Sequence, residues 1–433
     1  MAAPGAQPAP PLVVTGARWL DVASGRNRAL AAVVVENGRV RAVHDRQPPA
    51  LPDGATRIDA TDLTIVPGLV DALAHAAPTP DLDADYFYRL SLAHGVLVMR
   101  AVEVPLAWGA AQRQRVSAGE VLAPRLRVAG GPIGLPPAAT ANASGNGVNA
   151  ASGDAAERAA AADEVRRQAR LGADWVRLHP GASAGITAAV VAAARAHGVR
   201  VSAAAGATPL TELAETGVQA IEGLGDAGWD RLAPAEAKRL AERVAKSRVV
   251  LIPLLRLAVE REFGRDHPLV AAELAALAPN IRARVNRDGG TAPSARSRTR
   301  QAPPASRSWE ARLGFLRAFV AAGGRVAVAS GATSAGWPQP GMAIRHEIAL
   351  LVTAGLSPLD ALRAATVWPA DMLQADRRAG LTPGGPADFF AVRGDPLADV
   401  GALADIALIV RGGERLERDD LLAHALRATR RVK

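Results

Sequence analysis

Near both ends of the chain, short apolar runs alternate with turn residues. Runs of this kind cover residues 12–15, 32–40, 387–393 and 406–413. The dipeptide Asn37-Gly38 inside the second run is a strong signal for a hairpin turn. We expect residues 12–66 and 380–418 to fold together as one small β-sandwich domain, built from both ends of the chain.

Between these two segments the pattern changes to continuous apolar runs separated by Ala-rich helical stretches. The runs lie at residues 95–100, 173–178, 200–204, 219–222, 249–253 and 325–329. Their composition is typical of strands that are buried on both faces. Such strands joined by helices form parallel sheets, and roughly eight of them over about 300 residues form a (β/α)₈ TIM barrel. We expect this barrel to span residues 67–379.

Two stretches inside the expected barrel, residues 134–153 and 286–308, lack apolar periodicity. Both would leave the carboxyl-terminal rim, where loops contact the substrate in this architecture. They are either lids over a site or disordered insertions without a role. Outside the two domains we expect a disordered N-terminus (residues 1–11) and a helical, basic C-terminal tail (residues 419–433).

Composition narrows the class of protein. The chain has 433 residues, of which 49% are hydrophobic, and this is enough for a large buried core. It has no cysteine, which excludes disulfides and thiolate metal ligands. No apolar run is long enough to span a membrane, and the N-terminus has no basic region followed by an apolar one. We expect a cytoplasmic protein with no membrane partner.

The net charge of +9 is concentrated in two segments. Residues 282–307 carry +6 and residues 427–433 carry +4, which leaves −1 for the rest of the chain. The arginines of the first segment lie among Ser, Ala, Pro and Gln without interleaved aromatic residues. This pattern favours a solvated insertion over a nucleic-acid-binding surface. We therefore expect no nucleic-acid partner.

Two segments carry a family resemblance. Residues 64–75 read TIVPGLVDALAH and residues 380–396 read GLTPGGPADFFAVRGDP. The first resembles the PGLxDxHxH opening strand of the amidohydrolase superfamily, and the second resembles its GxxxPGxxADxxxxxxDP ending. The resemblance covers nearly the whole chain and is nearest to the imidazolonepropionase-like and prolidase-like branch. It implies the barrel with its β-sandwich, metal-dependent hydrolysis of C–N bonds, and a homo-oligomer such as a dimer.

The resemblance also locates the metal ligands of the family. The six positions fall on Leu73, His75, Arg177, Ala204, Gly223 and Ala332, so that one ligand remains. A catalytic zinc needs about three protein ligands and a site for water. At position 177 the family has a carbamylated lysine, whereas a guanidinium stays cationic and repels a divalent ion. The sequence therefore predicts no metal, no cofactor and an anionic ligand.

Residues two apart on a strand face the same way, and this alternation locates a candidate site at the barrel mouth. We take His75, Arg177 and His179 as candidate catalytic residues, because an arginine clamps a carboxylate or phosphate and an imidazole moves protons near neutral pH. The candidate ligand-binding residues are Asp71, Trp175, Ser202, Ser330, Thr333 and Ser334.

The candidate catalytic residues also have structural interpretations. Arg177 either binds a ligand or pairs with Asp71 in a buried ion pair, and His75 is either a general base or a hydrogen-bonded remnant of the metal site. His179 precedes Pro180-Gly181, so it either faces the mouth or belongs to a turn. Glu222 is expected to point away from the barrel interior if Gly223 occupies the old ligand position.

Three hypotheses about function follow. The favoured one is a non-catalytic protein, a pseudoenzyme, that binds a small anionic molecule or pairs with an active homologue. The second is a metal-independent hydrolase, cyclase or lyase that uses His75, Arg177 and His179 on an acidic or cyclic-amide substrate. The third is a conventional metal-dependent amidohydrolase. The first ranks ahead because the sequence offers no ordered nucleophile and no general base with an orienting partner.

Overall fold

The computed structural model describes residues 10–46, 50–78, 82–134, 155–206, 208–225, 228–288, 306–333, 337–375 and 381–428. Ser334, most of the expected N-terminal segment and residues 135–153 of the first expected insertion lie outside the described residues. None of the described helices is long and apolar enough to cross a membrane.

The first sheet is formed by the N-terminal part of the chain. Its four strands have the order β5 (Arg39–His44), β4 (Ala32–Glu36), β1 (Leu12–Thr15) and β6 (Thr56–Asp59). The expected hairpin turn joins β4 and β5, where Asn37 and Gly38 have φ angles of 50° and 73°. These positive values suit a two-residue hairpin turn, which explains the Asn-Gly pair.

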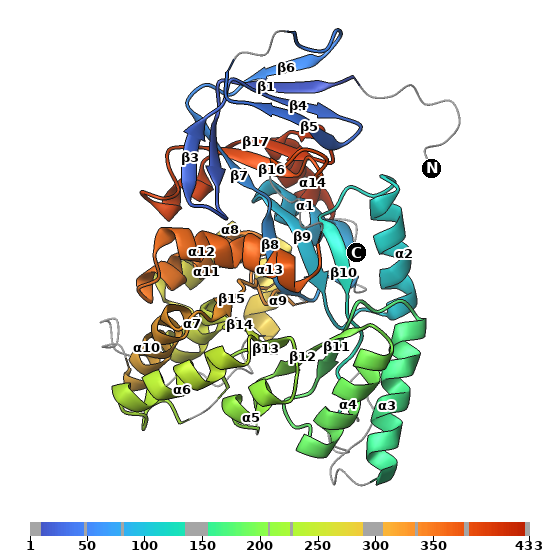
Figure 1. The fold of residues 1–433 in the computed structure, drawn as a ribbon, viewed down its shortest axis with the longest axis vertical. Helices are drawn as coiled ribbons and strands as arrows, with labels where there is room; N and C mark the ends of the chain where they lie inside the picture. The colour runs from blue at the N-terminus through green and yellow to red at the C-terminus, as the bar shows by residue number, and fades with distance from the viewer. Residues whose placement is uncertain are drawn as a thin grey trace.

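The second sheet joins the two ends of the chain. Its six strands have the order β18 (Glu414–Leu416), β17 (Ile406–Arg411), β16 (Phe389–Arg393), β7 (Leu63–Pro67), β2 (Arg18–Asp21) and β3 (Arg26–Ala29). Strands β16 and β7, more than 300 residues apart in sequence, pair in antiparallel fashion. Apolar residues of both sheets, such as Val14, Val33, Phe389 and Val410, belong to one buried cluster. Figure 1 shows the two sheets together at one end of the molecule.

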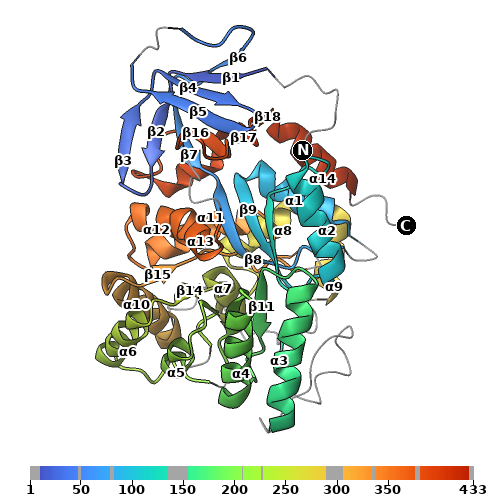
Figure 2. The same ribbon diagram turned by 45° about the vertical axis from the view of Figure 1, so that its right-hand side comes forward.

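The central part of the chain alternates strands and helices around two parallel sheets. The first contains β8 (Leu69–Ala74), β9 (Val96–Ala101) and β10 (Arg125–Val128). The second contains β11 (Trp175–Leu178), β12 (Arg200–Ala204), β13 (Ala220–Glu222), β14 (Val250–Ile252) and β15 (Arg325–Val326). The expected alternation of parallel strands and helices is confirmed, and Figure 2 shows helices packed outside the strands.

The two parallel sheets are connected by backbone contacts at both ends. Parallel bridges join Ala129 to Trp175 and Ile133 to Leu178, which links the chain after β10 to β11. On the other side, the chain after β15 runs beside β8. There Ala72 donates to the carbonyl of Val328 at 3.0 Å and His75 donates to that of Ala332 at 2.7 Å. The strand expected at residues 325–329 is therefore shorter, and its continuation is held by β8.

The helices that accompany these strands are α1 (Ala84–Ala93), α2 (Leu106–Ser117), α3 (Ala155–Arg170), α4 (Ala184–Ala196), α5 (Leu210–Glu215), α6 (Pro234–Lys246), α7 (Leu255–Phe263), α8 (Pro268–Ala276), α9 (Pro279–Asp288), α10 (Arg307–Ala321), α11 (Met342–Thr353), α12 (Pro358–Ala365), α13 (Val367–Met372) and α14 (Arg418–Ala428). A 3₁₀ helix covers Val400–Ala404. The second expected insertion, 286–308, is corrected at both ends, because α9 extends to Asp288 and α10 begins at Arg307. The helix α14 covers residues 418–428, within the segment where a helical tail is expected.

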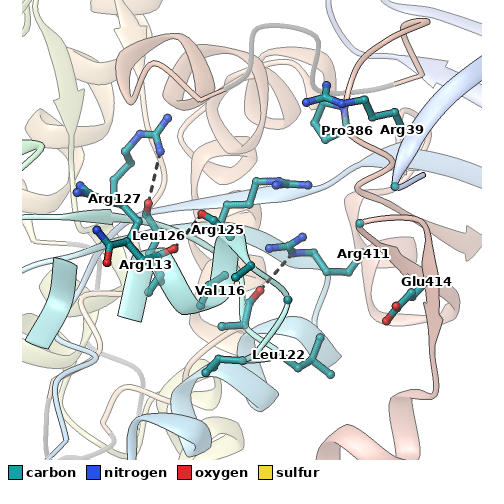
Figure 3. Close-up of a pocket in the computed structure, with 18 of the residues that line it drawn as sticks. Arg39, Arg113, Val116, Leu122, Arg125, Leu126, Arg127, Pro386, Arg411 and Glu414 are labelled. Atoms are coloured by element: carbon teal, nitrogen blue, oxygen red, sulfur yellow. Dashed lines mark hydrogen bonds between the residues drawn. The ribbon is translucent and has the colours of Figure 1, made fainter. Parts of the chain in front are cut away.

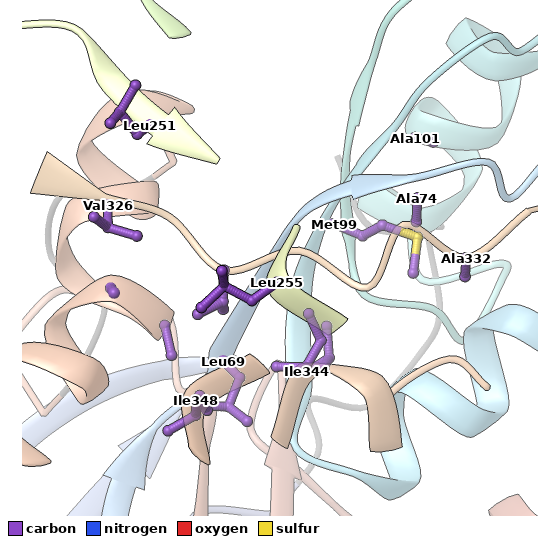
Figure 4. Close-up of a cluster of buried hydrophobic side chains, with 14 of the residues drawn as sticks. Leu69, Ala74, Met99, Ala101, Leu251, Leu255, Val326, Ala332, Ile344 and Ile348 are labelled. Carbon is purple, nitrogen blue, oxygen red and sulfur yellow. The ribbon is translucent and has the colours of Figure 1, made fainter. Parts of the chain in front are cut away.

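The strands carry apolar side chains on both faces, as their sequences predicted. One set includes Leu69, Met99 and Leu251 and packs against helix residues such as Ile348 of α11, all of which Figure 4 draws. The opposite set forms a separate cluster with Val70, Ala72, Leu73, Trp175 and Ala220 among its members. Alternation along β8 explains this division, because Leu69 faces the helices while Val70 faces the second cluster. The side chains described next lie beside that second cluster.

Candidate functional site

A chain of ionisable side chains, three of them buried, crosses the carboxyl-terminal part of the parallel strands. Arg100 lies on β9, Arg177 on β11 and Glu222 at the last position of β13. Glu103 follows the end of β9 and His75 follows the end of β8. Strand pairing sets Arg177 beside Ser202 and sets Ala204 beside Glu222, so side chains from these strands meet on one face.

Glu222 is the centre of this chain. It is 4% exposed and accepts from Nη2 of Arg100 at 2.6 Å and from Nη2 and Nε of Arg177 at 2.6 and 2.9 Å. Burial raises the pKa of this carboxyl, but Arg177 and Arg100 outweigh burial and hold it well below its usual range. The prediction that Glu222 points away from the interior is therefore wrong. Alternation from the buried Ala220 places both residues on the same face.

Arg177 is held between two carboxylates. Its Nε and Nη2 donate to Glu222, and its Nη1 donates to Glu103. Burial acts to lower its pKa, and the two carboxylates act more strongly to raise it, so the guanidinium remains charged. The prediction of a pair with Asp71 is wrong in its partner, although the buried ion pair itself is present. The positive charge of a guanidinium that pairs with two carboxylates is already balanced, so it attracts a further anion only weakly.

His75 is one end of the chain, and it lies beside Glu103, the most exposed of these residues. Its Nδ1 lies 3.2 Å from Oε2 of Glu103, and their side chains are 23% and 40% exposed. Burial acts to raise the pKa of Glu103, but His75 and Arg177 lower it to about 2. The carboxylate is therefore ionised throughout the neutral range. A carboxylate that holds one ring nitrogen fixes the orientation of an imidazole.

Asp71 belongs to a separate hydrogen-bonded group. Its Oδ1 accepts from the backbone N–H groups of Leu73 and Ser330 at 3.1 and 3.0 Å, and its Oδ2 accepts from the Ser330 hydroxyl at 2.5 Å. The carboxyl is fully buried, and burial raises its pKa to about 6 despite these hydrogen bonds. Asp71 and Ser330 thus connect β8 to the chain after β15 and are not directed at Arg177.

The remaining candidates are divided between the interior and the rim. Trp175 is 1% exposed with the Arg100 guanidinium 5.0 Å from its ring centroid, and the Ser202 hydroxyl accepts from Arg100 at 2.8 Å. His179 lies at the partly exposed rim, where its Nδ1 accepts from the N–H of Gly181 at 3.1 Å. This hydrogen bond supports the second interpretation of His179, in which it belongs to a turn. The Thr333 hydroxyl donates to the carbonyl of Trp337 at 2.8 Å.

The residues present do not fit a catalytic metal ion. Leu73 lies in the buried apolar cluster, and Ala204, Gly223 and Ala332 offer no side-chain donor. Gly223 has a φ of 75°, a left-handed conformation in which a histidine would be strained. Within the described ranges, no group of three or more His, Asp or Glu side chains is arranged to hold a metal. The chain thus differs from the family pattern in the side chains available to bind a metal.

A small cavity of about 150 Å³ lies beside this site at the carboxyl ends of β12 to β14. Gly223, Leu224, Pro253 and Leu255 are among its apolar walls, and Arg261 and Arg312 are its charged residues. Arg312 is already paired with Glu262 at 2.8 Å. An acidic group in this cavity would therefore meet Arg261 first.

Comparison with known proteins identifies the family. A model of the amidohydrolase family matches residues 64–416, and the chain belongs to that family. No curated protein matches the sequence.

Solved structures with a similar fold share little sequence with the chain. A putative prolidase from Bifidobacterium longum is 21% identical with a TM-score of 0.69, over 97% of this chain and 100% of that one. Molinate hydrolase is 15% identical with a TM-score of 0.70, over 96% of both chains. A bottromycin amidohydrolase is 22% identical with a TM-score of 0.67, over 97% of this chain and 90% of that one. At such identities the likeness establishes the fold and leaves the activity to the site.

Sequence reasoning missed two members of the charged chain. Arg100 was not assigned to the site, although a charged residue inside a buried strand signals a buried partner. Glu103 lies in a loop with a φ of 56°, and no motif identifies it. Its role becomes visible only from its contacts with His75 and Arg177.

Proposed function

We propose that this amidohydrolase-family protein works without a catalytic metal and binds a small molecule that it does not hydrolyse by metal-activated water. The observation that carries the proposal is the position of Arg177, whose donors are directed to Glu222 and Glu103. A guanidinium between two carboxylates provides the charge balance that metal ions and their ligands provide in an active relative. The proposal therefore treats the charged chain as a structural replacement for the metal centre.

We further propose that the parallel strands close into one (β/α)₈ barrel and that the two outer sheets form a β-sandwich. The hydrogen bonds from Ala72 and His75 to the chain after β15, and the bridge from Ala129 to Trp175, support closure. The apolar cluster shared by both outer sheets supports the sandwich. We keep the boundaries near residues 67 and 380 as part of this proposal, and the pairing of β7 with β16 supports it.

The ligand we propose is small and amino-acid-like, and it would lie in the cavity beside Gly223. The cavity of about 150 Å³ is smaller than a typical drug-sized site, and its walls are mainly apolar. One solved relative is a Xaa-Pro dipeptidase with methionine in its active site, which suggests methionine and an Ala-Pro dipeptide as probes. A carboxylate on either probe would meet Arg261 at the rim.

Isothermal titration with these two probes tests the proposed ligand, and a hydrolysis assay with added Zn²⁺ or Mn²⁺ tests the absence of metal-dependent activity. We expect saturable binding of at least one probe, with no hydrolysis of the dipeptide above the rate of metal alone. The variant Ala205→Leu fills the cavity and should abolish binding, whereas Ala188→Leu on the exposed face of α4 should leave it unchanged. Metal-stimulated hydrolysis that requires His75 would contradict the proposal.

A second function, metal-independent acid–base catalysis, is favoured by the contact between His75 and Glu103. The carboxylate supplies the orienting partner that the sequence alone did not reveal, and the imidazole lies near solvent. In this proposal His75 transfers a proton to or from a bound substrate, and Glu103 holds the ring. His179, at the same rim, would contact the substrate.

An activity screen of cyclic amides and acidic small molecules tests this second function. If it is correct, His75→Ala abolishes any activity found, and Glu103→Gln reduces it and changes its pH profile, because the ring loses its orienting charge. Both variants should remain folded by circular dichroism, since both side chains are partly exposed. An activity that persists in His75→Ala would exclude the role of His75.

A further inference from the structure

A second cavity, of about 930 Å³, lies where the outer sheets meet the parallel strands. Its walls are the β4–β5 turn at residues 37–39, the end of α2 with the following loop at residues 113–123, the first three residues of β10, and the β17–β18 turn. β10 enters the cavity with its first residues, whereas His75 follows the last residue of the parallel strand β8. The cavity is therefore at the opposite end of the strands from the His75 site.

The walls of this cavity are strongly basic. The charged side chains that line it are Arg39, Arg113, Arg125, Arg127, Arg411 and Glu414. Two carboxylates lie behind the wall, where Asp388 contacts Arg125 and Arg411, and Asp174 lies 2.5 Å from Arg113. Figure 3 shows Arg125 and Arg411 extending toward each other from opposite sides of the cavity. Among the described residues, positive charge thus exceeds negative charge in and behind the walls.

Arg127 has no carboxylate among the contacts of the described residues. Its Nε and Nη2 donate to the main-chain carbonyls of Leu373 and Gln374 at 2.9 and 2.6 Å. Carbonyl oxygens hold the orientation of a guanidinium without cancelling its charge. Arg411 also donates to a carbonyl, that of Ala123 at 3.2 Å, but its charge is partly balanced by Asp388, which it shares with Arg125. Fixed guanidinium groups lose little side-chain entropy when an anion binds, which favours affinity.

The cavity also has room for more than a single inorganic ion. Its volume lies in the range of about 300 to 1,000 Å³ that holds organic ligands. Val116, Val121, Leu122 and Leu126 add apolar surface between the arginines. The distribution of arginines over several wall segments suits a ligand with more than one anionic group, because each guanidinium pairs with one phosphate or carboxylate.

We propose that this cavity binds a small organic anion with two or more phosphate or carboxylate groups, recognised by Arg127, Arg411 and their neighbours. The site is independent of His75 and of the cavity beside Gly223. It lies between the outer sheets and β10, so that a bound anion connects the two parts of the fold. Such a ligand would stabilise the contact between the β17–β18 turn and the start of β10, because it binds residues of both.

Isothermal titration with ADP, citrate and uncharged adenosine tests the proposal on the full chain. We expect one saturable site for ADP, citrate or both, no site for adenosine, and weaker binding as the salt concentration rises, because salt screens charge. Binding of ADP alone identifies phosphate as the recognised group, and binding of citrate identifies carboxylate. If neither anion binds at low salt, the proposal is wrong.

Two variants with opposite expected effects locate the site. Arg127→Gln should weaken binding by about tenfold or more through loss of a charge-assisted contact. Glu414→Gln removes an exposed lining carboxylate and should strengthen binding severalfold. The matched controls Arg393→Gln and Glu417→Gln lie outside the lining and should not change affinity. If either test variant folds and binds with unchanged affinity, the proposal is wrong. If Arg127→Gln does not fold, the affinity of Glu414→Gln alone decides the test.

Discussion

At the scale of single residues, the interior of this protein depends on one carboxylate that serves two arginines. Arg100 and Arg177 are both buried, and Glu222 contacts each of them. Removing one partner of a buried ion pair leaves a charge without compensation, which costs more than the pair contributes when intact. Glu103 is the weaker member of the chain, because its side chain is 40% exposed and water can replace it.

Glu222→Gln should lower the free energy of unfolding by about 3–5 kcal/mol, since both guanidinium groups lose their shared negative charge. Urea denaturation at neutral pH measures this loss. Glu103→Gln is the matched control and should cost clearly less because of its exposure. An equal or smaller loss for Glu222→Gln than for Glu103→Gln would contradict the assignment of Glu222 as the centre of the network.

Asp71→Asn should change how stability depends on pH. The folded protein raises the pKa of Asp71 from 3.8 to about 6, so between these values the folded state binds more protons than the unfolded state. Stability from this group therefore falls as pH rises from about 4 to 6, by on the order of 3 kcal/mol for a shift of about two units. The asparagine keeps an acceptor for the N–H groups of Leu73 and Ser330 and does not titrate.

Urea denaturation of wild type and Asp71→Asn between pH 4 and 7 measures this effect. The variant should gain stability relative to wild type as pH rises through this window. Asp360→Asn, at a partly exposed helix end, controls for the loss of a carboxylate in general. Parallel stability curves for wild type and Asp71→Asn would show that the buried carboxyl does not titrate as described.

At the scale of elements, the contact between β8 and the chain after β15 is the junction that completes the parallel strands. Asp71 and Ser330 form its side-chain part, and the carbonyls of Val328 and Ala332 form its backbone part. The chain after β15 has few residues in regular strand geometry, so these hydrogen bonds are what hold it beside β8.

Ser330→Ala should weaken this junction by about 1–3 kcal/mol, because Oδ2 of the buried Asp71 loses its hydroxyl donor. Hydrogen exchange should accelerate at the amides of Ala72 and His75, which donate across the junction. Ser357→Ala, which removes a cap at the start of α12, is a control that should affect exchange only locally. Unchanged protection at Ala72 and His75 would contradict the structural role of Ser330.

The sequence predicted most strands, because apolar runs of four to six residues carry a strong signal. It also located two strands of three residues, since the runs at 219–222 and 249–253 contain β13 and β14, but it did not fix which face each side chain occupies. β13 has three residues and is followed by Gly223 at a positive φ, so aligning the family's ligand position to Gly223 gave the wrong face for Glu222. Glu103 could not be predicted, since a loop conformation brings it to Arg177. The strand expected to end at residue 329 was overextended, because its regular pairing with β14 stops at Val326 and the chain beyond it is held by single hydrogen bonds, such as those from Ala327 to Leu251 and from Ala72 to Val328.

At the scale of the whole molecule, the chain has the family fold, and three positions that the resemblance aligns with metal ligands have structural roles of their own. Leu73 joins an apolar cluster, Arg177 joins an ion-pair chain, and Gly223 has a left-handed backbone. The arginine and its neighbours depend on each other, because the buried charge of Arg177 is stable only beside the carboxylates of Glu222 and Glu103. The expectation of a dimer remains a prediction, which light scattering on the purified protein would test.

The most direct measurement is metal binding. Purified wild type and His75→Ala are saturated with Zn²⁺, dialysed against metal-free buffer and subjected to elemental analysis. We predict far less than one equivalent of zinc per chain and no difference between the two proteins, since among the residues that the structure describes His75 belongs to no group of three side chains able to hold an ion. One or two equivalents of tightly held zinc that disappear in His75→Ala would contradict the account.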